Sequence, residues 1–198
     1  MNALLLIDLQ NDFCRYGALE VPDGDATIAV ANELMSDYDL VVATQDWHPA
    51  NHGSFAANHL WRKPGQMIEL DGLPQMLWPI HCVQNSFGAE FVKALHIDKI
   101  TKVFRKGTDV NIDSYSGFYD NGHRKSTGMG EYLQAQGVTE VTVMGLATDY
   151  CVKFSALDAL TFGFKTTFIE RGSRGVNLQA DDVKNAIAEM REKGVIIA

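Results

Sequence analysis

Short apolar runs recur along the 198-residue chain and alternate with stretches of a different spacing. These runs are rich in Val, Ile, Leu and Thr, and they predict strands at residues 3–8, 40–44, 100–104, 140–145 and 165–169, with a short sixth strand at 195–197. Most of them lack a regular alternation of apolar and polar positions. A continuous apolar run indicates a strand that is covered on both faces, as in a parallel sheet.

Between the runs, apolar residues recur at the spacing of one helix face. This spacing predicts helices at residues 25–36, 89–95, 130–136, 149–162 and 180–192. Strands and helices therefore alternate along the chain, which implies right-handed crossovers between parallel strands. The sequence predicts an α/β fold, a three-layer α/β/α sandwich with a six-stranded, mainly parallel sheet, in which residues 1–198 form a single domain.

Two long stretches break the alternation. Residues 46–87 contain all three tryptophans and four of the six histidines, with no predicted helix or strand, and residues 106–127 are equally irregular and polar. A loop of that length inside a compact domain is usually functional. Both stretches follow predicted strands, so both are expected at the carboxyl edge of the sheet, where open α/β sheets bind their ligands.

The charge and the terminal sequence exclude several classes of partner. Seventeen Lys and Arg against 25 Asp and Glu give a net charge of −8, which disfavours nucleic acid. No apolar run has the roughly 20 residues that a membrane helix needs, and the N-terminus lacks a signal peptide, so we expect a cytoplasmic protein without a membrane partner. The three widely spaced cysteines argue against a disulfide framework. The sequence leaves the oligomeric state open, a homo-oligomer included.

Reactive residue types follow four of the predicted strands. Asp8 follows the first strand, Asp46 and His48 the second, Lys106 the third and Cys151 the fourth. Because the carboxyl ends of parallel strands share one edge, an acid, a metal-binding pair, a cation and a thiol are expected to face one crevice.

The thiol of Cys151 is the candidate nucleophile. It lies at the start of a predicted helix, after a turn that contains glycine, where backbone N–H groups and the helix dipole are expected to lower its pKa and favour the thiolate. The same N–H groups could stabilise an oxyanion. Cys14 and Cys82 have no such context, and we interpret both as packing residues.

A metal site is expected around Asp46 and His48. Two residues apart on an extended segment, their side chains can point the same way, and carboxylate and imidazole suit Zn²⁺ or Fe²⁺. His81 is the candidate that completes the set across the long loop. His52, four residues beyond His48, is the alternative, and water molecules can fill the same position, so the spacing leaves both open.

Taken together, these residues carry a resemblance that covers nearly the whole chain. The chain resembles the bacterial nicotinamidases of the isochorismatase-like cysteine hydrolase family. The resemblance rests on LLLIDLQNDF around Asp8, ATQDWHPANHGSF around the metal pair, PIHCVQ at His81, FRKGT at Lys106, DSYSGF at residues 113–118 and MGLATDYCVKFSALDAL around Cys151. The family fold, a parallel six-stranded sheet between helices, agrees with the pattern above.

The resemblance also implies roles for individual residues. Asp8, Lys106 and Cys151 would form the catalytic triad. One divalent metal ion, Zn²⁺ first with Fe²⁺ or Mn²⁺ as alternatives, would be held by Asp46, His48 and His81. In the family this metal orients water and the ring nitrogen of nicotinamide.

Two further features follow from the resemblance. Aromatic side chains flank the substrate ring in the family, and Phe13, Trp78 and Tyr115 stand at the matching positions. A cis peptide bond between Leu146 and Ala147 would turn the N–H of Ala147 toward that of Cys151, and the two N–H groups would form the oxyanion hole.

The implied activity is the hydrolysis of the small molecule nicotinamide to nicotinate and ammonia through a cysteine thioester, as in the salvage of NAD, with pyrazinamide as a second substrate. Two alternatives stay open: another amidase of the superfamily that acts on an N-carbamoyl compound, and a non-catalytic metal-binding α/β module. An isochorismatase-type vinyl ether hydrolase is disfavoured, because that branch lacks the nucleophilic cysteine.

Overall fold

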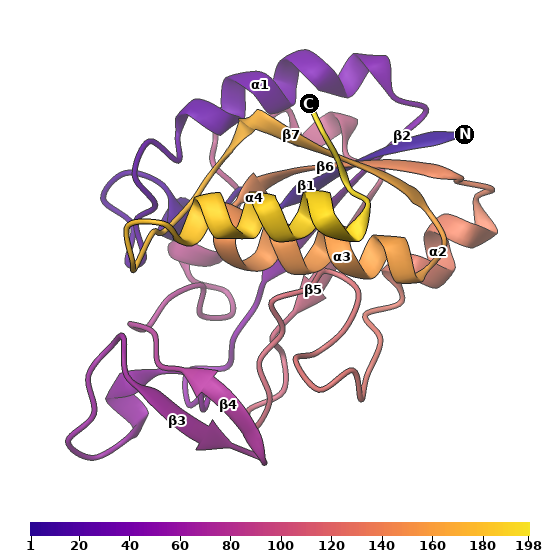
Figure 1. The fold of residues 1–198 in the computed structure, drawn as a ribbon. Helices are drawn as coiled ribbons and strands as arrows, with labels where there is room; N and C mark the ends of the chain where they lie inside the picture. The colour runs from indigo at the N-terminus through magenta and orange to yellow at the C-terminus, as the bar shows by residue number, and fades with distance from the viewer.

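Six parallel strands form the central sheet of the computed structural model, which describes residues 1–198 (Figure 1). Every neighbouring pair runs parallel, in the order β5-β2-β1-β6-β7-β8. The predicted six-stranded sheet is therefore confirmed, and it is parallel throughout. Its strands are β1 (Asn2–Ile7), β2 (Leu40–Asp46), β5 (Lys102–Lys106), β6 (Glu140–Leu146), β7 (Lys165–Arg174) and β8 (Ile196–Ile197).

Helices cover both faces of this sheet, which confirms the three layers (Figure 1). One core cluster joins the sheet to α2 (Met129–Ala135), α3 (Lys153–Thr161) and α4 (Asp182–Lys193), and a second joins the opposite face to α1 (Ala26–Leu34). None of the four α-helices combines the length and the apolar character that crossing a membrane requires.

The strand β1 shows why the apolar runs did not alternate. Leu4 and Leu6 pack in the cluster that contains α1, whereas Leu5 and Ile7 pack in the cluster that contains α2 to α4. Since successive side chains of a strand point to opposite faces, a strand between two helix layers needs apolar residues at every position.

The predicted helix at residues 89–95 is wrong. Only a short 3₁₀ helix, Phe87–Ala89, forms at its start. Beyond it the backbone pairs with the segment after β1, where the N–H of Val92 donates to the carbonyl of Leu9 (3.1 Å). The apolar residues of this stretch, Leu95 among them, pack into the core from irregular backbone. Their helical spacing therefore reflected burial and not a helix.

A hairpin inside residues 46–87 was also not predicted. Its antiparallel strands are β3 (Met67–Leu70) and β4 (Leu73–Met76), and they project from the body of the molecule (Figure 1). The two turn residues Asp71 and Gly72 both have positive φ, +48° and +80°, as a two-residue hairpin turn with the Asp-Gly sequence requires. Residues 107–127 form no helix or named strand, as expected.

The order of the strands locates the site. The chain moves from β1 to β2 and β5 on one side, and from β6 to β7 and β8 on the other. The connections thus change direction between the neighbouring strands β1 and β6. A crevice opens beyond the carboxyl ends of strands at such a switch point.

Candidate active site

The crevice collects side chains from the ends of three strands. Asp8 follows β1, Lys106 ends β5, and Cys151 lies in the turn after β6. Asp8 is fully buried, and Thr44 on the neighbouring strand holds it by donating a hydrogen bond of 2.6 Å to Asp8 Oδ1. The predicted convergence on the carboxyl edge is therefore observed.

Lys106 lies at the centre of this group. Its side chain is buried, and its Nζ lies 2.9 Å from Asp8 Oδ2 and 3.1 Å from Asp46 Oδ1. The same nitrogen donates a hydrogen bond of 2.8 Å to the carbonyl of Ser114 and contacts Cys151 Sγ at 3.4 Å. One ammonium group therefore contacts Asp8, Asp46 and Cys151 at once.

Burial and the neighbouring charges shift the pKa values of all three groups. It raises the pKa of the Cys151 thiol well above its ordinary value, because desolvation outweighs the stabilising charge of Lys106. Burial likewise raises the pKa of Asp8, which Lys106 offsets only in part. For Lys106, desolvation alone would lower the pKa, but the nearby carboxylates raise it well above its usual range. Burial therefore opposes the lowering of the Cys151 pKa that was expected at the helix start.

The backbone around Cys151 departs from a regular helix. Residues Thr148–Val152 form a single π-helical turn, and α3 begins only at Lys153. The peptide bond between Leu146 and Ala147 is cis, as the resemblance implied. Ala147 and Cys151 both line the same pocket.

The other two cysteines do not line this pocket. Cys14 and Cys82 are buried in the core cluster on the α1 side of the sheet. Burial raises the pKa of Cys14 to about 12 and that of Cys82 well above its ordinary value. All three cysteines are free thiols, so the interpretation of these two as packing residues fits their positions.

A second cluster adjoins the first and consists of Asp46, His48 and His81. The Nε2 atoms of His48 and His81 lie 3.0 and 3.3 Å from Asp46 Oδ2. The Nδ1 atoms of these rings face the carbonyls of Gly107 and Pro79, each at 2.8 Å. Because a carbonyl only accepts, Nδ1 donates to it, and in the neutral form of each ring Nε2 would be the unprotonated nitrogen. Three acceptor atoms thus converge, and the set fits a divalent cation.

Gly107 makes this arrangement feasible. Its φ is +63°, and a Cβ atom at this position would collide with the ring of His48. The glycine therefore lets the backbone carbonyl approach His48 closely enough to fix its tautomer.

His52 is buried beside His48, with ring centroids 4.2 Å apart, but its protonation differs. The N–H of Ser54 donates to His52 Nδ1 (3.2 Å), so the proton of the neutral ring resides on Nε2. Burial and the neighbouring His48 lower the pKa of His52 to about 4, which keeps the ring neutral. Its Nε2 is buried without a partner in the protein. His52 is not part of the Asp46, His48 and His81 group and lies instead with His48 and Asp113 in a second group of ligand-type side chains.

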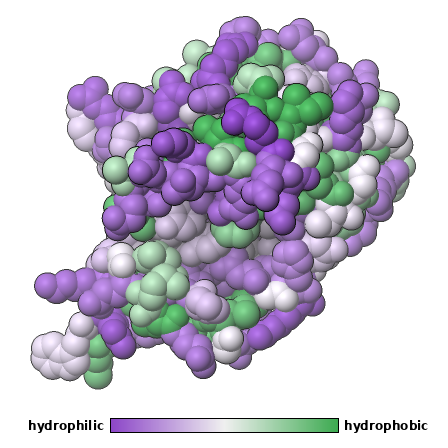
Figure 2. Space-filling view, viewed as in Figure 1, coloured by the Kyte–Doolittle hydropathy of each residue, from purple (hydrophilic) through white to green (hydrophobic).

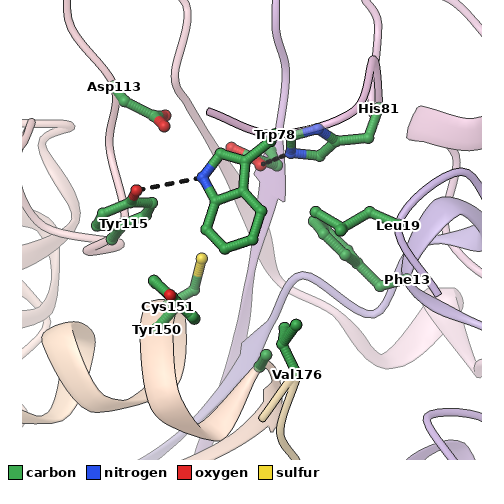
Figure 3. Close-up of a pocket in the computed structure, with 11 residues that line it drawn as sticks. Phe13, Leu19, Trp78, His81, Asp113, Tyr115, Tyr150, Cys151 and Val176 are labelled. Carbon is green, nitrogen blue, oxygen red and sulfur yellow. Dashed lines mark hydrogen bonds and ion pairs between the residues drawn. The ribbon is translucent and has the colours of Figure 1, made fainter. Parts of the chain in front are cut away.

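The pocket above Cys151 has mostly apolar walls (Figure 3). Trp78 Nε1 donates a hydrogen bond of 3.2 Å to the hydroxyl of Tyr115, and the ring of Phe13 meets His81 edge-on at 5.6 Å. All three aromatic residues named from the sequence thus line the pocket. The full lining comprises Phe13, Leu19, Asp46, Trp78, His81, Asp113, Tyr115, Ala147, Tyr150, Cys151 and Val176.

Several of these residues were not predicted. Leu19 and Val176 come from loops whose sequences carry no signal, whereas Tyr150 is the direct neighbour of the candidate nucleophile. Gln75, the only buried residue of β4, was missed as well. Its Nε2 lies 3.0 Å from Asp113 Oδ2 and 3.2 Å from the hydroxyl of Tyr115, which ties the hairpin to the pocket wall.

A wider groove lies next to the pocket. The hairpin residues Met67 and Met76 form one side of it, and Lys153 and Glu189, from α3 and α4, form the other. Figure 2 shows it as the hollow between the lobe of the hairpin and the body of the molecule. Tyr150 and Tyr115 line both spaces and separate them.

Known proteins share this architecture. A family model described as the isochorismatase domain matches residues 2–198. The nicotinamidase of Escherichia coli is 53% identical, over 98% of this chain and 93% of that protein. Two similar solved structures are the nicotinamidase/pyrazinamidase of Acinetobacter baumannii (44% identity, TM-score 0.96, 99% and 94% of the two chains) and the pyrazinamidase of Pyrococcus horikoshii in complex with zinc (36%, 0.80, 100% and 98%). By sequence and by fold, this chain belongs to the isochorismatase family.

Proposed function

We propose that the protein is a nicotinamidase, which hydrolyses nicotinamide to nicotinate and ammonia and also accepts pyrazinamide. The observation that carries the proposal is that a buried thiol, Cys151, and two of the metal donors, Asp46 and His81, line one pocket with aromatic walls. A planar heteroaromatic amide fits such a pocket, with its ring nitrogen toward the metal donors and its carboxamide toward the thiol. Curated relatives with this activity at up to 53% identity support the same assignment.

In this proposal Asp46, His48 and His81 hold one divalent metal ion. Zn²⁺ is the first choice, since a similar pyrazinamidase is described with zinc, and Fe²⁺ or Mn²⁺ are the alternatives. When bound, the metal would supply a positive centre that orients water and the ring nitrogen. Phe13, Trp78 and Tyr115 would hold the ring between them.

The first half of the reaction forms a thioester. Asp8 accepts the proton of Cys151, whose sulfur then forms a bond to the carboxamide carbon. The N–H groups of Ala147 and Cys151 stabilise the oxyanion. As the C–N bond breaks, the protonated Asp8 gives its proton to the leaving ammonia. The raised pKa of Asp8 suits it to this exchange, because a carboxyl group that holds a proton more firmly is a better base for a protonated thiol.

The second half releases nicotinate. Asp8, again ionised, takes a proton from water, and the oxygen of that water attacks the thioester carbon. The C–S bond then breaks, and Asp8 returns its proton to the sulfur of Cys151. Lys106 balances the negative charge that alternates between these two groups, since it lies within 3.4 Å of both.

The test is an ammonia-release assay with a matched series of amides. Nicotinamide and pyrazinamide are expected to turn over. Benzamide has the same shape without the ring nitrogen, so its kcat/KM is expected to be lower by roughly 100-fold or more. N-carbamoyl compounds are expected to be inert. Hydrolysis of an N-carbamoyl compound in preference to nicotinamide would assign the protein to the other amidase class.

Removal of the metal is expected to abolish nicotinamide turnover while Cys151 remains reactive. Elemental analysis of the purified protein should find about one transition-metal ion per chain, as a single three-ligand site requires. After chelation, titration calorimetry should detect no nicotinamide binding, and one equivalent of Zn²⁺ should restore it. A metal-free protein with unchanged turnover would contradict the role of these three residues.

His52→Ala is expected to weaken Zn²⁺ binding by about 10- to 100-fold, the range for a residue that supports a ligand from outside the coordination sphere. His48→Ala, which removes a direct donor, is expected to weaken it far more. Competition with a fluorescent chelator measures both affinities without reference to activity. Equal losses for the two variants would make His52 a direct ligand.

A further inference from the structure

Asp149 joins the turn after β6, which contains Cys151, to the loop that follows the neighbouring strand β7. It is buried in the π-helical turn, two residues before the thiol. Its Oδ1 accepts a hydrogen bond from the N–H of Val176 (3.0 Å), and its Oδ2 accepts one from the N–H of Asn177 (2.7 Å). The carboxylate therefore uses both oxygens to hold two consecutive residues of the loop between β7 and α4.

The loop is built for this close approach. A Cβ atom at Gly175 would lie 3.1 Å from Asp149 Oδ1 and would collide with Val183 on α4. Asn177 has a φ of +50°, and its side chain accepts a hydrogen bond of 3.1 Å from the N–H of Val183. Asp149 and the first turn of α4 thus hold the same short segment of the loop, and Asn177 contacts both.

Val176, whose N–H Asp149 holds, lines the substrate pocket (Figure 3). Ala147 and Cys151 lie in the same lining, on the turn that contains Asp149. Asp149 lines the neighbouring groove but not this pocket, so toward the pocket it acts through the residues that it positions. A hydrogen bond to a charged group is among the stronger single contacts in a protein, and here two of them fix one wall.

We propose that Asp149 is a positioning residue that determines substrate specificity: by holding residues 176 and 177 it fixes the Val176 wall, which sets how large a substituent the substrate ring can carry. The proposal rests on the proposed function, because the ring is that of nicotinamide. Asp149 is not a catalytic residue. Its substitution weakens binding of the substrate ring more than it changes the reactivity of the thiol.

The test compares Asp149→Asn with Val176→Ala and with the double variant. Asp149→Asn preserves size and replaces one acceptor oxygen by an NH₂ group that faces an N–H. The KM for nicotinamide is expected to rise about 10-fold with kcat within about twofold, since one of the two charged hydrogen bonds is lost. If Asp149 acts through Val176, adding Asp149→Asn to Val176→Ala should change kcat/KM by less than about twofold.

Specificity is measured with a series of nicotinamides that each carry one methyl group, at a different ring carbon in each compound. For at least one methyl isomer, the ratio of its kcat/KM to that of nicotinamide should be higher in Asp149→Asn and in Val176→Ala than in the wild type. Asp182→Asn is the matched control, because Asp182 accepts a backbone hydrogen bond from Gln179 (2.8 Å) in the same loop but away from the pocket. That variant should leave the ratios unchanged.

Hydrogen exchange tests the anchor without any substrate. The amides of Val176 and Asn177 should exchange slowly in the wild type and at least about 10-fold faster in Asp149→Asn. If the wild type does not hydrolyse nicotinamide, the proposed function fails while the exchange still reports on the anchor. Unchanged exchange, full additivity with Val176→Ala, or a fall in kcat without a change in KM would each overturn the inference. Should Asp149→Asn not fold, unchanged methyl ratios in Val176→Ala would overturn it.

Discussion

Cys151→Ala is expected to lower the rate of nicotinamide hydrolysis by roughly 10⁵-fold or more, because loss of the nucleophile removes the covalent route altogether. The fold and the metal content should persist, since the thiol faces the pocket and is no ligand of the metal cluster. Ammonia release measures the rate, and elemental analysis with thermal unfolding checks the protein. Turnover within about 100-fold of the wild type would exclude a thioester mechanism at this residue.

The matched control is Cys14→Ala, a second buried free thiol that lies in the core cluster on the α1 side of the sheet. This variant loses the same sulfur atom from a packed interior, so its free energy of unfolding should fall by about 1 kcal/mol. Its turnover should stay near that of the wild type. A loss comparable to that of Cys151→Ala would mean that the wrong thiol has been assigned.

Lys106→Met is expected to damage both activity and stability. Methionine matches the length of the lysine, but its uncharged side chain leaves the carboxylates of Asp8 and Asp46 buried without their shared cation. Removing one partner of a buried ion pair typically costs about 3–5 kcal/mol of unfolding free energy. The kcat/KM should fall steeply as well, because the cation lies next to the groups that exchange charge during the reaction. Denaturant unfolding and steady-state kinetics measure the two effects.

The pH profile of Lys106→Met separates a catalytic cation from a structural one. Lys106 lowers the pKa of Asp8, so its removal must raise that pKa further. The ionised form of Asp8 then requires a higher pH, and the acid limb of kcat/KM should move upward. Lys102→Met, an exposed lysine on the same strand, is the control and should leave the limb in place. An unmoved limb in Lys106→Met would remove Asp8 from the proposed mechanism.

The fold could be predicted because strands buried on both faces differ from helices in sequence. The apolar runs placed all six strands of the sheet, to within a few residues. The helix at 89–95 was wrong because apolar spacing records burial, and irregular backbone can bury the same residues against the segment after β1. The hairpin at 67–76 was missed because its strands are only four residues long and mostly half-buried or exposed, so neither forms a continuous buried run. Its Asp71–Gly72 turn nevertheless matches the Asp-Gly signature of a two-residue hairpin turn.

The candidate site also contains some residues that the sequence could predict and others that it could not. Asp8, Lys106 and Cys151 could be proposed because each lies at the end of a strand, where topology brings distant residues together. Leu19 and Val176 could not, because they reach the pocket from long loops whose paths depend on packing. The expected direction of the Cys151 pKa shift was wrong for a related reason: the sequence locates a helix start but not the depth at which the thiol is buried.

Asp46 makes the two clusters a single thermodynamic unit. One of its oxygens contacts Lys106, and the other faces His48 and His81. By linkage, a cation that binds to the second oxygen must alter the proton affinity of the groups around the first oxygen. Protonation of those groups must alter the affinity for the cation by the same factor. A variant at Asp46 therefore changes metal affinity and proton affinity together. Variants at His48 or His81 on one side, and at Asp8 on the other, separate the two contributions.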